Sequence, residues 1–416
     1  MKIELAPAGA ALRGHAAPII WGGAGSNALR TPIDPWFSTW GRVAKPAMGM
    51  ARVGTAVFLA DRMTRRPART LTRALDLIVH VPDPSAIRPA IQPLCELMHW
   101  ITGDTWSIEL VRDRTRPDTR PQQLRAAERV GLLSGGLDSF CGSVLSHTND
   151  IVYLGHGDAS NVRSAQDAVL AWYSDNGVEL DMETVWLLPP TRAGKEASRR
   201  SRAAFFVLLA VALADASGAT EIEIPENGFT SLNPPLGANR GGVWTTRSTH
   251  PHTIERLNAI LATAGLGVTL VNPYETLTKG ELVEAAASAA RTAGLSNFAS
   301  ALAGTQSCAK ADGRFYGGSP LDNCGLCFAC VVRRGGVLHA VGGDSTRYLC
   351  DTLRKANRQE LVDRRRPDIH AITSFATRGV TRAQLVATGP FGAMTLGSAA
   401  DLCARSAQEL AGVPLP

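Results

Sequence analysis

The sequence predicts an α/β protein built on a doubly wound parallel sheet. From Arg129 onward, short apolar runs alternate with segments of helical period, and a Gly-rich turn directly follows the first of these runs. Strands and helices that alternate at this length are typical of a parallel sheet covered on both faces. We therefore expect the carboxyl ends of the strands to meet at one edge, where such sheets bind their ligands.

Five strands are expected in this sheet, and helices separate them. The apolar runs lie at 129–134, 151–158, 183–189, 220–226 and 267–273. A first helix follows the Gly-rich turn, and the others are expected near 161–176, 197–217, 252–265 and 278–293. These elements belong to a predicted domain spanning residues 126–345.

A separate N-terminal α+β region is predicted over residues 1–125. It contains strands at 74–81 and 105–111, with a helix between them that ends at Gly103, whereas the opening 60 residues show no clear period. The charged, Pro-containing segment 112–125 is the expected linker. At the other end, residues 346–416 are expected to form a small helical cap with helices at 381–389 and 399–412.

The charge balance and the apolar segments narrow the class of protein. The 416 residues carry a formal net charge of +6, which is compatible with nucleic acid. Arg is scattered, however, and the run Arg364-Arg365-Arg366 is read as a solvated face, so a nucleic-acid partner is not favoured. The most apolar stretch, 205–216, is too short to span a bilayer. We expect a cytoplasmic protein without a membrane partner, and a homodimer is compatible with the sequence.

The strongest single feature is Ser134-Gly135-Gly136-Leu137-Asp138-Ser139, between an apolar strand and a helix. The N–H groups at a helix start have no internal partner and carry partial positive charge, so a phosphate is favoured there. The two glycines allow close backbone approach, and Ser134 and Ser139 add hydroxyl donors. Asp138 is expected to hold Mg²⁺ or to orient the loop. The alternative is a Gly-rich helix-capping turn that binds no ligand.

His156 and Gly157 end the second predicted strand. The tip of that strand borders the adenosine pocket in this fold class, so both residues are expected to line it. The alternative is a structural histidine that makes its hydrogen bonds at the end of the strand and binds no ligand.

Four cysteines are spaced C-x15-C-x2-C-x2-C, at Cys308, Cys324, Cys327 and Cys330. Thiolates at this spacing can fill all four positions of a tetrahedral Zn²⁺, which makes the expected site structural. An iron–sulfur cluster and four reduced thiols are the alternatives. Cys141, just after the Gly-rich loop, is read as a small buried residue and not as a nucleophile.

The loop matches SGGxDS, the motif of the PP-loop ATP-pyrophosphatases, whose fold is adenine nucleotide alpha hydrolase-like. With the cysteine pattern, the chain resembles the QueC (7-cyano-7-deazaguanine synthase) family over about residues 129–340. Arg202 resembles the Arg that opens the family's long helix, Thr278 to Leu282 resembles its TKxE segment, and TQSC at 305–308 resembles its TWSC.

The departures from QueC point to a subgroup. QueC lacks the first 125 residues and the C-terminal extension, and its substrate-side segment differs from PENGFTSLNPPLGANRGGVWTTRSTHPH at 225–252. This segment resembles the QueC-like proteins of bacterial anti-phage systems, such as QatC and the QueC-like protein of type IV CBASS.

The resemblance implies an ATP-dependent enzyme that adenylates the carboxylate of 7-carboxy-7-deazaguanine or a related 7-deazaguanine, with Mg²⁺. It then forms an amide with an amine, and the added regions favour an amine on a partner protein. A small-molecule synthase that uses ammonia and a tRNA-modifying PP-loop enzyme are the alternatives. The expected catalytic residues are Asp138, Arg202 and Lys279, and the expected substrate-binding residues are Glu226, Asn227, Arg247 and His250.

Overall fold

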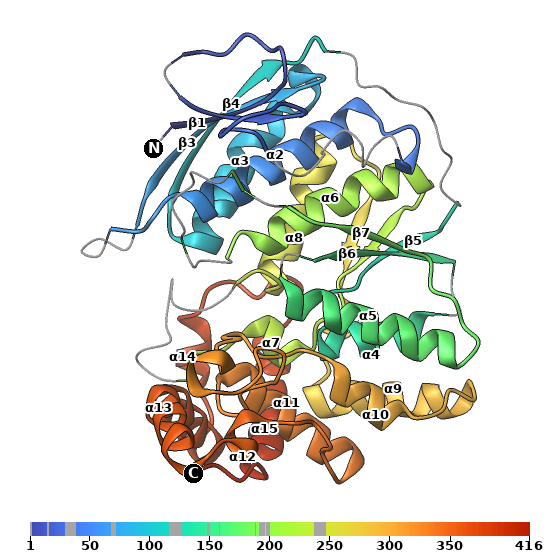
Figure 1. Ribbon diagram of the computed structural model, residues 1–416, viewed down its shortest axis with the longest axis vertical. Coiled ribbons are helices and arrows are strands. Elements are labelled where there is room, and N and C mark those ends of the chain that lie inside the picture. Colours follow the sequence, from blue (N-terminus) through green and yellow to red (C-terminus); the bar gives the residue numbers. More distant parts are fainter. Residues whose placement is uncertain are drawn as a thin grey trace.

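The computed structural model describes residues 2–14, 16–29, 39–67, 72–115, 126–147, 150–157, 159–187, 189–190, 196, 200–236 and 247–416. Within these residues the chain forms two parallel sheets with layers of helices between and below them (Figure 1). Most of the predicted linker, 116–125, lies outside the described residues.

The N-terminal sheet has four parallel strands in the order β2-β1-β3-β4. Its strands are β1 (Lys2–Pro7), β2 (Ala17–Trp21), β3 (Ala74–Val81) and β4 (Thr105–Arg112). Its helices are α2 (Lys45–Met63) and α3 (Pro84–Thr102). The predicted strands and the helix ending at Gly103 are confirmed, and Gly103 adopts φ of 75°. The prediction of an α+β unit is wrong, because all four strands run parallel, which makes this region α/β.

The second sheet has five parallel strands in the order β7-β6-β5-β8-β9, as the alternation of elements predicts. They are β5 (Arg129–Leu132), β6 (Ile151–His156), β7 (Met182–Val185), β8 (Glu221–Glu223) and β9 (Thr269–Val271). They are shorter than the apolar runs that predict them. The direction of chain progression reverses between β5 and β8, and such a switch point is where open parallel sheets bind ligands.

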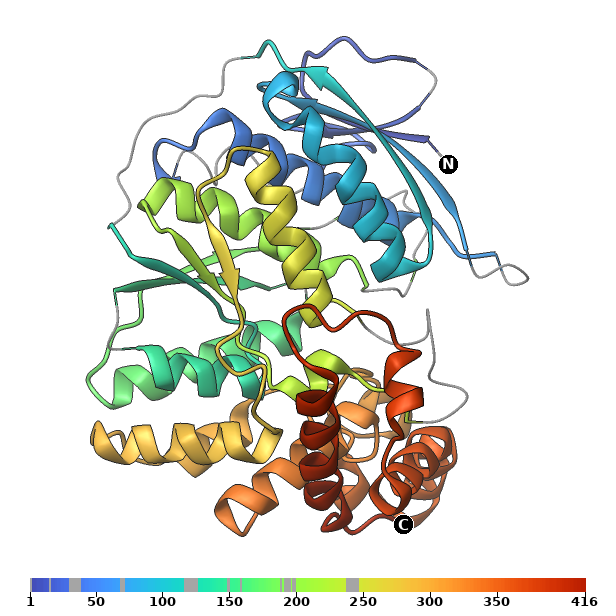
Figure 2. The same cartoon turned by 180° about the vertical axis from the view of Figure 1, so that it is seen from behind.

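Helices cover both faces of this sheet, so it is doubly wound (Figures 1 and 2). One face carries α4 (Leu137–Ser146) and α5 (Ser160–Asp175), with α9 (Lys279–Thr292) packed against α4. The other face carries α6 (Arg202–Ser217) and α8 (Pro251–Thr263).

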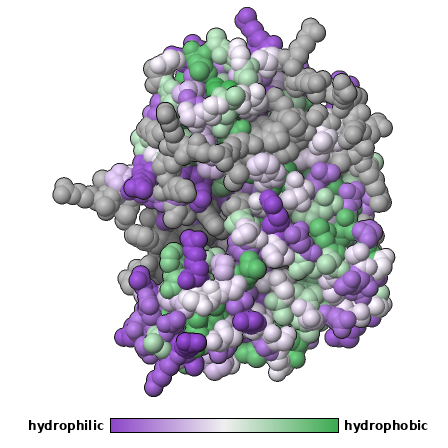
Figure 3. Space-filling view, viewed as in Figure 1, coloured by the Kyte–Doolittle hydropathy of each residue, from purple (hydrophilic) through white to green (hydrophobic). Residues whose placement is uncertain are grey.

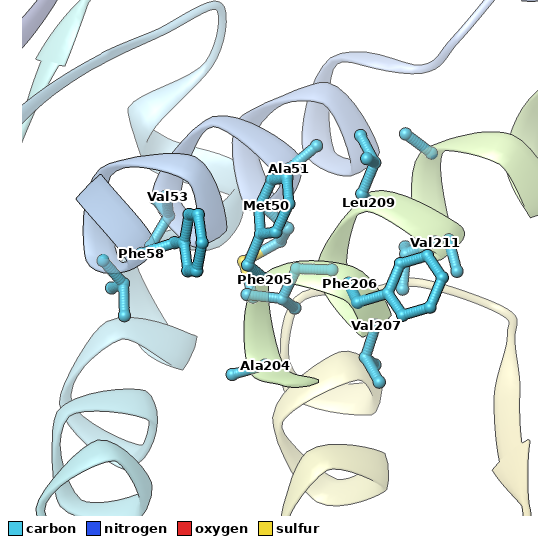
Figure 4. Close-up of a cluster of buried hydrophobic side chains, with 14 of the residues drawn as sticks. Met50, Ala51, Val53, Phe58, Ala204, Phe205, Phe206, Val207, Leu209 and Val211 are labelled. Carbon is cyan, nitrogen blue, oxygen red and sulfur yellow. The ribbon is translucent and has the colours of Figure 1, made fainter. Parts of the chain in front are cut away.

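The helix α6 is buried on all sides because it lies between the second sheet and α2. In Figure 4, side chains of α2, including Met50 and Phe58, face Phe205 and its neighbours on α6. The rings of Phe58 and Phe205 stack with centroids 5.1 Å apart. Gly54 permits the close crossing, since a Cβ there would lie 2.9 Å from Leu208 Cβ. One hydrophobic core therefore continues from the N-terminal sheet into the second domain.

The remainder of the chain is helical and packs beside the carboxyl edge of the second sheet. Its elements are α7 (Gly228–Leu232), α10 (Phe298–Gly304), η3 (Gly313–Tyr316), α11 (Phe328–Val341), α12 (Leu349–Thr352), α13 (Lys355–Arg378), α14 (Arg382–Val386) and α15 (Leu396–Ala411). Two of them, α14 and α15, confirm the helices predicted in the cap. Hydrophilic side chains gather over α13 at the lower left of Figure 3. No described helix has the length and apolar character needed to cross a membrane.

Candidate functional site

The Gly-rich loop lies at the switch point, between the end of β5 and the start of α4. Gly135 has φ of +77°, and a Cβ there would come within 3.0 Å of Ala165 Cβ and the Gln166 nitrogen on α5. The loop closes on itself, because the Ser139 hydroxyl accepts from the Ser134 N–H at 3.1 Å. The sequence-based placement of this loop at a helix start is therefore confirmed, and glycine is needed at Gly135 for both conformation and space.

A pocket of about 510 Å³ opens beside this loop. The ends of β5 and β8, the start of α6 and the C-terminal helices all contribute to its walls. Its polar lining includes Ser134, Ser139, Arg202, Glu226, Lys310 and Asp368. The pocket therefore combines hydroxyl, cationic and carboxyl groups at the edge where the parallel sheet is expected to bind a ligand.

Asp138 lies buried beneath the loop and is surrounded by polar partners. Its Oδ1 forms an ion pair with Lys279 Nζ, and its Oδ2 accepts from Asn227 Nδ2 at 2.8 Å and from the Asn227 N–H at 3.2 Å. The exposed fractions of Asp138 and Lys279 are 6% and 8%. The predicted catalytic pair is thus brought together from α4 and α9.

Glu226 is the second carboxyl of this cluster, and it lines the pocket. Burial, the charge of Asp138 and a hydrogen bond to Asp138 raise the pKa of Glu226 well above its ordinary value. Burial opposes ionisation of Asp138 as well, but the charge of Lys279 and the surrounding hydrogen bonds lower its pKa. These surroundings favour the charged form of Asp138 and the neutral form of Glu226. Two carboxyl groups side by side are the oxygen donors that Mg²⁺ prefers, so this donor set fits a divalent cation.

Arg202 reaches the pocket from the first turn of α6 and is held by His156. Its Nε donates to His156 Nδ1 at 3.4 Å, and its Nη2 donates to the His156 carbonyl at 3.2 Å. His156 itself is fully buried among aromatic rings, and neither it nor Gly157 belongs to the pocket lining. The structure therefore makes His156 a support for Arg202. Neither His156 nor Gly157 lines this pocket, and their contact with adenosine stays a prediction.

Arg247 and His250 lie outside the pocket lining, at the start of α8. The guanidinium carbon of Arg247 sits 3.7 Å from the centroid of the Trp100 ring, on α3. His250 caps α8 by accepting from the His252 N–H at 3.3 Å, and only 2% of it is exposed. Both side chains fasten α8 to the N-terminal domain, so the roles in substrate binding predicted for them are not met in this geometry.

The Asn227 side chain makes its hydrogen bonds to other residues of the protein. Its Nδ2 donates to Asp138 and to Thr230 Oγ1 at 2.8 Å, and its Oδ1 caps α7 by accepting from the Thr230 N–H. Asn227 therefore orients Asp138, whereas Glu226 keeps a place in the pocket wall.

The four predicted cysteines converge on one buried point. The Sγ atoms of Cys308, Cys324, Cys327 and Cys330 all lie within 4.8 Å of one another, so the cluster could hold a metal ion such as zinc. Asn323 Oδ1 accepts from the Ser307 and Cys308 N–H groups, each at 2.9 Å, which fixes the upstream cysteine.

A cation lies beside the cysteine cluster, namely Arg365 of α13. Arg365 bonds Asp312 at 2.5 Å. Burial opposes its charge, but Asp312 and Cys324 together raise the pKa of Arg365. Such a guanidinium can offset part of the negative charge of four thiolates.

Residues 302–307 connect the cysteine cluster to the Gly-rich loop. The Gln306 N–H donates to the Gly135 carbonyl at 2.9 Å. The buried Arg333 holds the same segment through Thr305 Oγ1 at 2.6 Å and Ser307 Oγ at 3.2 Å. Cys327 also lines the pocket. A metal here would therefore stabilise one wall of the pocket without taking part in the chemistry.

No family model matches this chain. No protein with a curated description is significantly similar to it either.

The C-terminal helix α15 contacts the residues on either side of Lys279. The sequence did not indicate this contact. Glu409 on α15 accepts from the Thr278 hydroxyl and, at 3.1 Å, from the Gly280 N–H, on either side of Lys279. Gly280 leaves the room for this contact, because a Cβ there would lie 2.5 Å from Glu409 Oε1. Lys310 and Asp368 were likewise missed as pocket residues, since no local pattern marks them.

Proposed function

We propose that this protein is a QueC-like ATP-pyrophosphatase that activates a carboxylate by adenylation. One observation carries the proposal: Ser134 and Ser139 of the SGGLDS loop line one pocket with the cations Arg202 and Lys310, at the switch point of a parallel sheet. The Asp138–Lys279 pair lies buried beneath the loop, outside the pocket lining. Hydroxyl and backbone donors with two cations suit a polyphosphate, because each favours negative charge.

The proposed chemistry proceeds in two steps. A substrate carboxylate oxygen attacks the α-phosphorus of ATP, and pyrophosphate leaves. An amine then attacks the acyl carbon, AMP leaves, and the amine releases a proton. Ser134 and Ser139 would bind the pyrophosphate part, and Arg202 would stabilise negative charge on the phosphates. Asp138 would hold Mg²⁺, whose charge would supply additional neutralisation of the phosphates.

The substrate class follows from the resemblance to QueC-like proteins. We propose a 7-deazaguanine carboxylate, and an amine on a partner protein as the acceptor in bacterial anti-phage defence. Glu226 faces the pocket and can accept hydrogen bonds from an amino-pyrimidinone edge once it is ionised. Phe206 and Phe328 add aromatic surface to the pocket, which suits a flat ring.

The pocket offers little to a thiolation mechanism of the tRNA-modifying type. Cys141 is fully buried, and burial raises the pKa of its thiol far above its ordinary value. The cysteine that does line the pocket, Cys327, belongs to the four-cysteine cluster. An activated thiol is therefore not positioned for attack among the described residues.

The test is AMP release from purified protein with ATP, Mg²⁺ and 7-carboxy-7-deazaguanine, combined with intact-mass analysis of co-expressed neighbouring proteins. AMP that depends on the deazaguanine, with a matching mass gain on a partner, supports the whole proposal. AMP without a protein adduct points to a small-molecule synthase that uses ammonia. If the deazaguanine has no effect on AMP release, the proposed substrate is wrong. Arg247→Gln, outside the pocket, is a control expected to retain activity.

A further inference from the structure

We infer that the N-terminal domain is part of the phosphate-binding machinery, and that Phe58 and Asp61 on α2 are positioning residues for Arg202. The inference rests on the proposed function, because it takes Arg202 as a phosphate-binding cation. It assigns a role to a domain that the sequence left without one.

The first line of contact runs from Phe58 through His156 to Arg202. The Phe58 ring meets the His156 ring edge-on, with centroids 5.7 Å apart and an interplanar angle of 84°. Phe205 packs on both, at 5.1 Å from Phe58 and 5.0 Å from His156. The imidazole is thereby fixed with Nδ1 toward Arg202 Nε. Removing the Phe58 ring would free the imidazole to turn, and Arg202 would lose an acceptor.

The second line runs from Asp61 to the residue that precedes Arg202. Asp61 Oδ2 accepts from the Ser201 hydroxyl at 2.7 Å and from the Ser201 N–H at 3.3 Å. Ser201 is the N-cap residue of α6, so this carboxylate anchors the helix end from which Arg202 projects. Asp61 is itself fully buried and is held by Arg73.

Both sets of contacts restrict the Arg202 side chain: one holds its guanidinium and the other holds the start of its helix. Arg202 is half-buried, and an arginine at a pocket wall would otherwise sample many rotamers before a ligand arrives. An anchored helix end and a fixed acceptor leave its guanidinium already oriented toward the pocket. Such preorganisation favours binding of charge without a reorganisation cost. The N-terminal domain thus contributes to the site without contacting the ligand.

The decisive experiment measures the affinity of the full chain for ATP and for adenosine by equilibrium titration. The variants are Phe58→Leu, which keeps an apolar side chain, and Ser201→Ala, which removes only the hydroxyl donor to Asp61. Each is expected to weaken ATP binding about tenfold, the effect of losing one charge-assisted hydrogen bond, with adenosine binding unchanged. Asp61→Ala is avoided, because it would remove one of the two buried carboxylates that pair with Arg73.

Two comparisons separate positioning from simple loss of stability. Val211→Ala shortens a buried side chain on the same helix, nine residues from Arg202, and is expected to lower the melting temperature without changing ATP affinity. His156→Asn can still offer an oxygen acceptor to Arg202 and should bind ATP better than His156→Phe.

Equal ATP affinity in Phe58→Leu, Ser201→Ala and wild type would overturn the inference. Parallel losses for ATP and adenosine would overturn it too, because they indicate a distorted pocket. If the wild type does not bind ATP, the proposed function fails and the inference fails with it.

Discussion

Asp138 and Lys279 lie 141 residues apart in the sequence and form a buried ion pair beneath the Gly-rich loop at Ser134 to Ser139. Their two helices pack side by side, and Glu409 braces the one that carries Lys279. The stability of the fold therefore depends on both residues of this buried pair, since removing one leaves the other charge buried without a partner.

Asp138→Asn should reduce AMP release at least about 100-fold, because it removes the carboxylate expected to hold Mg²⁺. It should also lower the free energy of unfolding by about 3–5 kcal/mol, since Lys279 remains buried and charged. The double variant Asp138→Asn/Lys279→Met should recover part of that stability and no activity. Chromatographic AMP assays and calorimetry measure the two effects. Normal AMP release by the single variant would remove the loop from the mechanism.

The cysteine cluster should hold one zinc ion per chain, to be counted by elemental mass spectrometry. Cys324→Ser should lose the metal and melt at a lower temperature, because a structural zinc contributes folding free energy directly. Cys350→Ser is the matched control, because this buried neighbouring thiol is not one of the four cysteines whose Sγ atoms converge. A metal-free Cys324→Ser protein with unchanged melting would contradict a structural metal.

Stability should fall in mild acid because of His250. Burial lowers the pKa of His250 from 6.5 to about 4, with Arg247 and His252 adding to the shift. The unfolded chain therefore binds a proton between these values that the folded chain does not. The stabilisation is present above pH 6.5 and is lost progressively as the pH falls toward 4.

At pH 5 this loss amounts to about 2 kcal/mol relative to pH 7.5. His250→Asn keeps a good N-cap acceptor and should narrow the pH 5 to pH 7.5 difference in urea unfolding by that amount. The exposed His370→Asn is the control. An unchanged difference in His250→Asn would show that this histidine is not the cause.

Gly54→Val should destabilise the contact between α2 and α6. A Cβ at this position would lie 2.9 Å from Leu208 Cβ and 3.4 Å from Phe205 Cα, so the helices must separate. Overpacking of this kind costs about 1–3 kcal/mol. Chemical unfolding measures it, with Gly267→Ala as the control, because that position faces open space. If Gly54→Val and the wild type have the same unfolding midpoint, α2 and α6 do not pack closely at Gly54.

The elements of the second sheet were predictable because their apolar runs and turn residues are local signals. The same holds for the phosphate loop and the cysteine cluster, whose members stand at fixed short spacings. In contrast, α2 gives no period, since nearly every residue from Ala47 to Asp61 is buried, including Arg52. A helix enclosed on all sides has no polar face to reveal it.

Contacts between distant segments explain why the sequence did not reveal the structural partners of several predicted site residues. Nothing near Arg247 indicates that its guanidinium would stack on Trp100 of another domain. The run Arg364-Arg365-Arg366 was read as a solvated face, which holds for the first and third, whereas Arg365 turns inward to Asp312. Which of these three arginines is buried depends on how α13 packs against the segment that contains Asp312 and the cysteine cluster.

The burial of α6 on all sides also bears on the order of synthesis. When this helix leaves the ribosome, every element of the N-terminal domain has already been made, whereas β8 and β9 have not. The side of α6 that packs on α2 can therefore find its partner at once, whereas the side that packs on the second sheet meets β5 and β6 before β8 has been made. The N-terminal domain would then cover an apolar segment during translation, which is a reason for it to precede the domain of the second sheet in the chain.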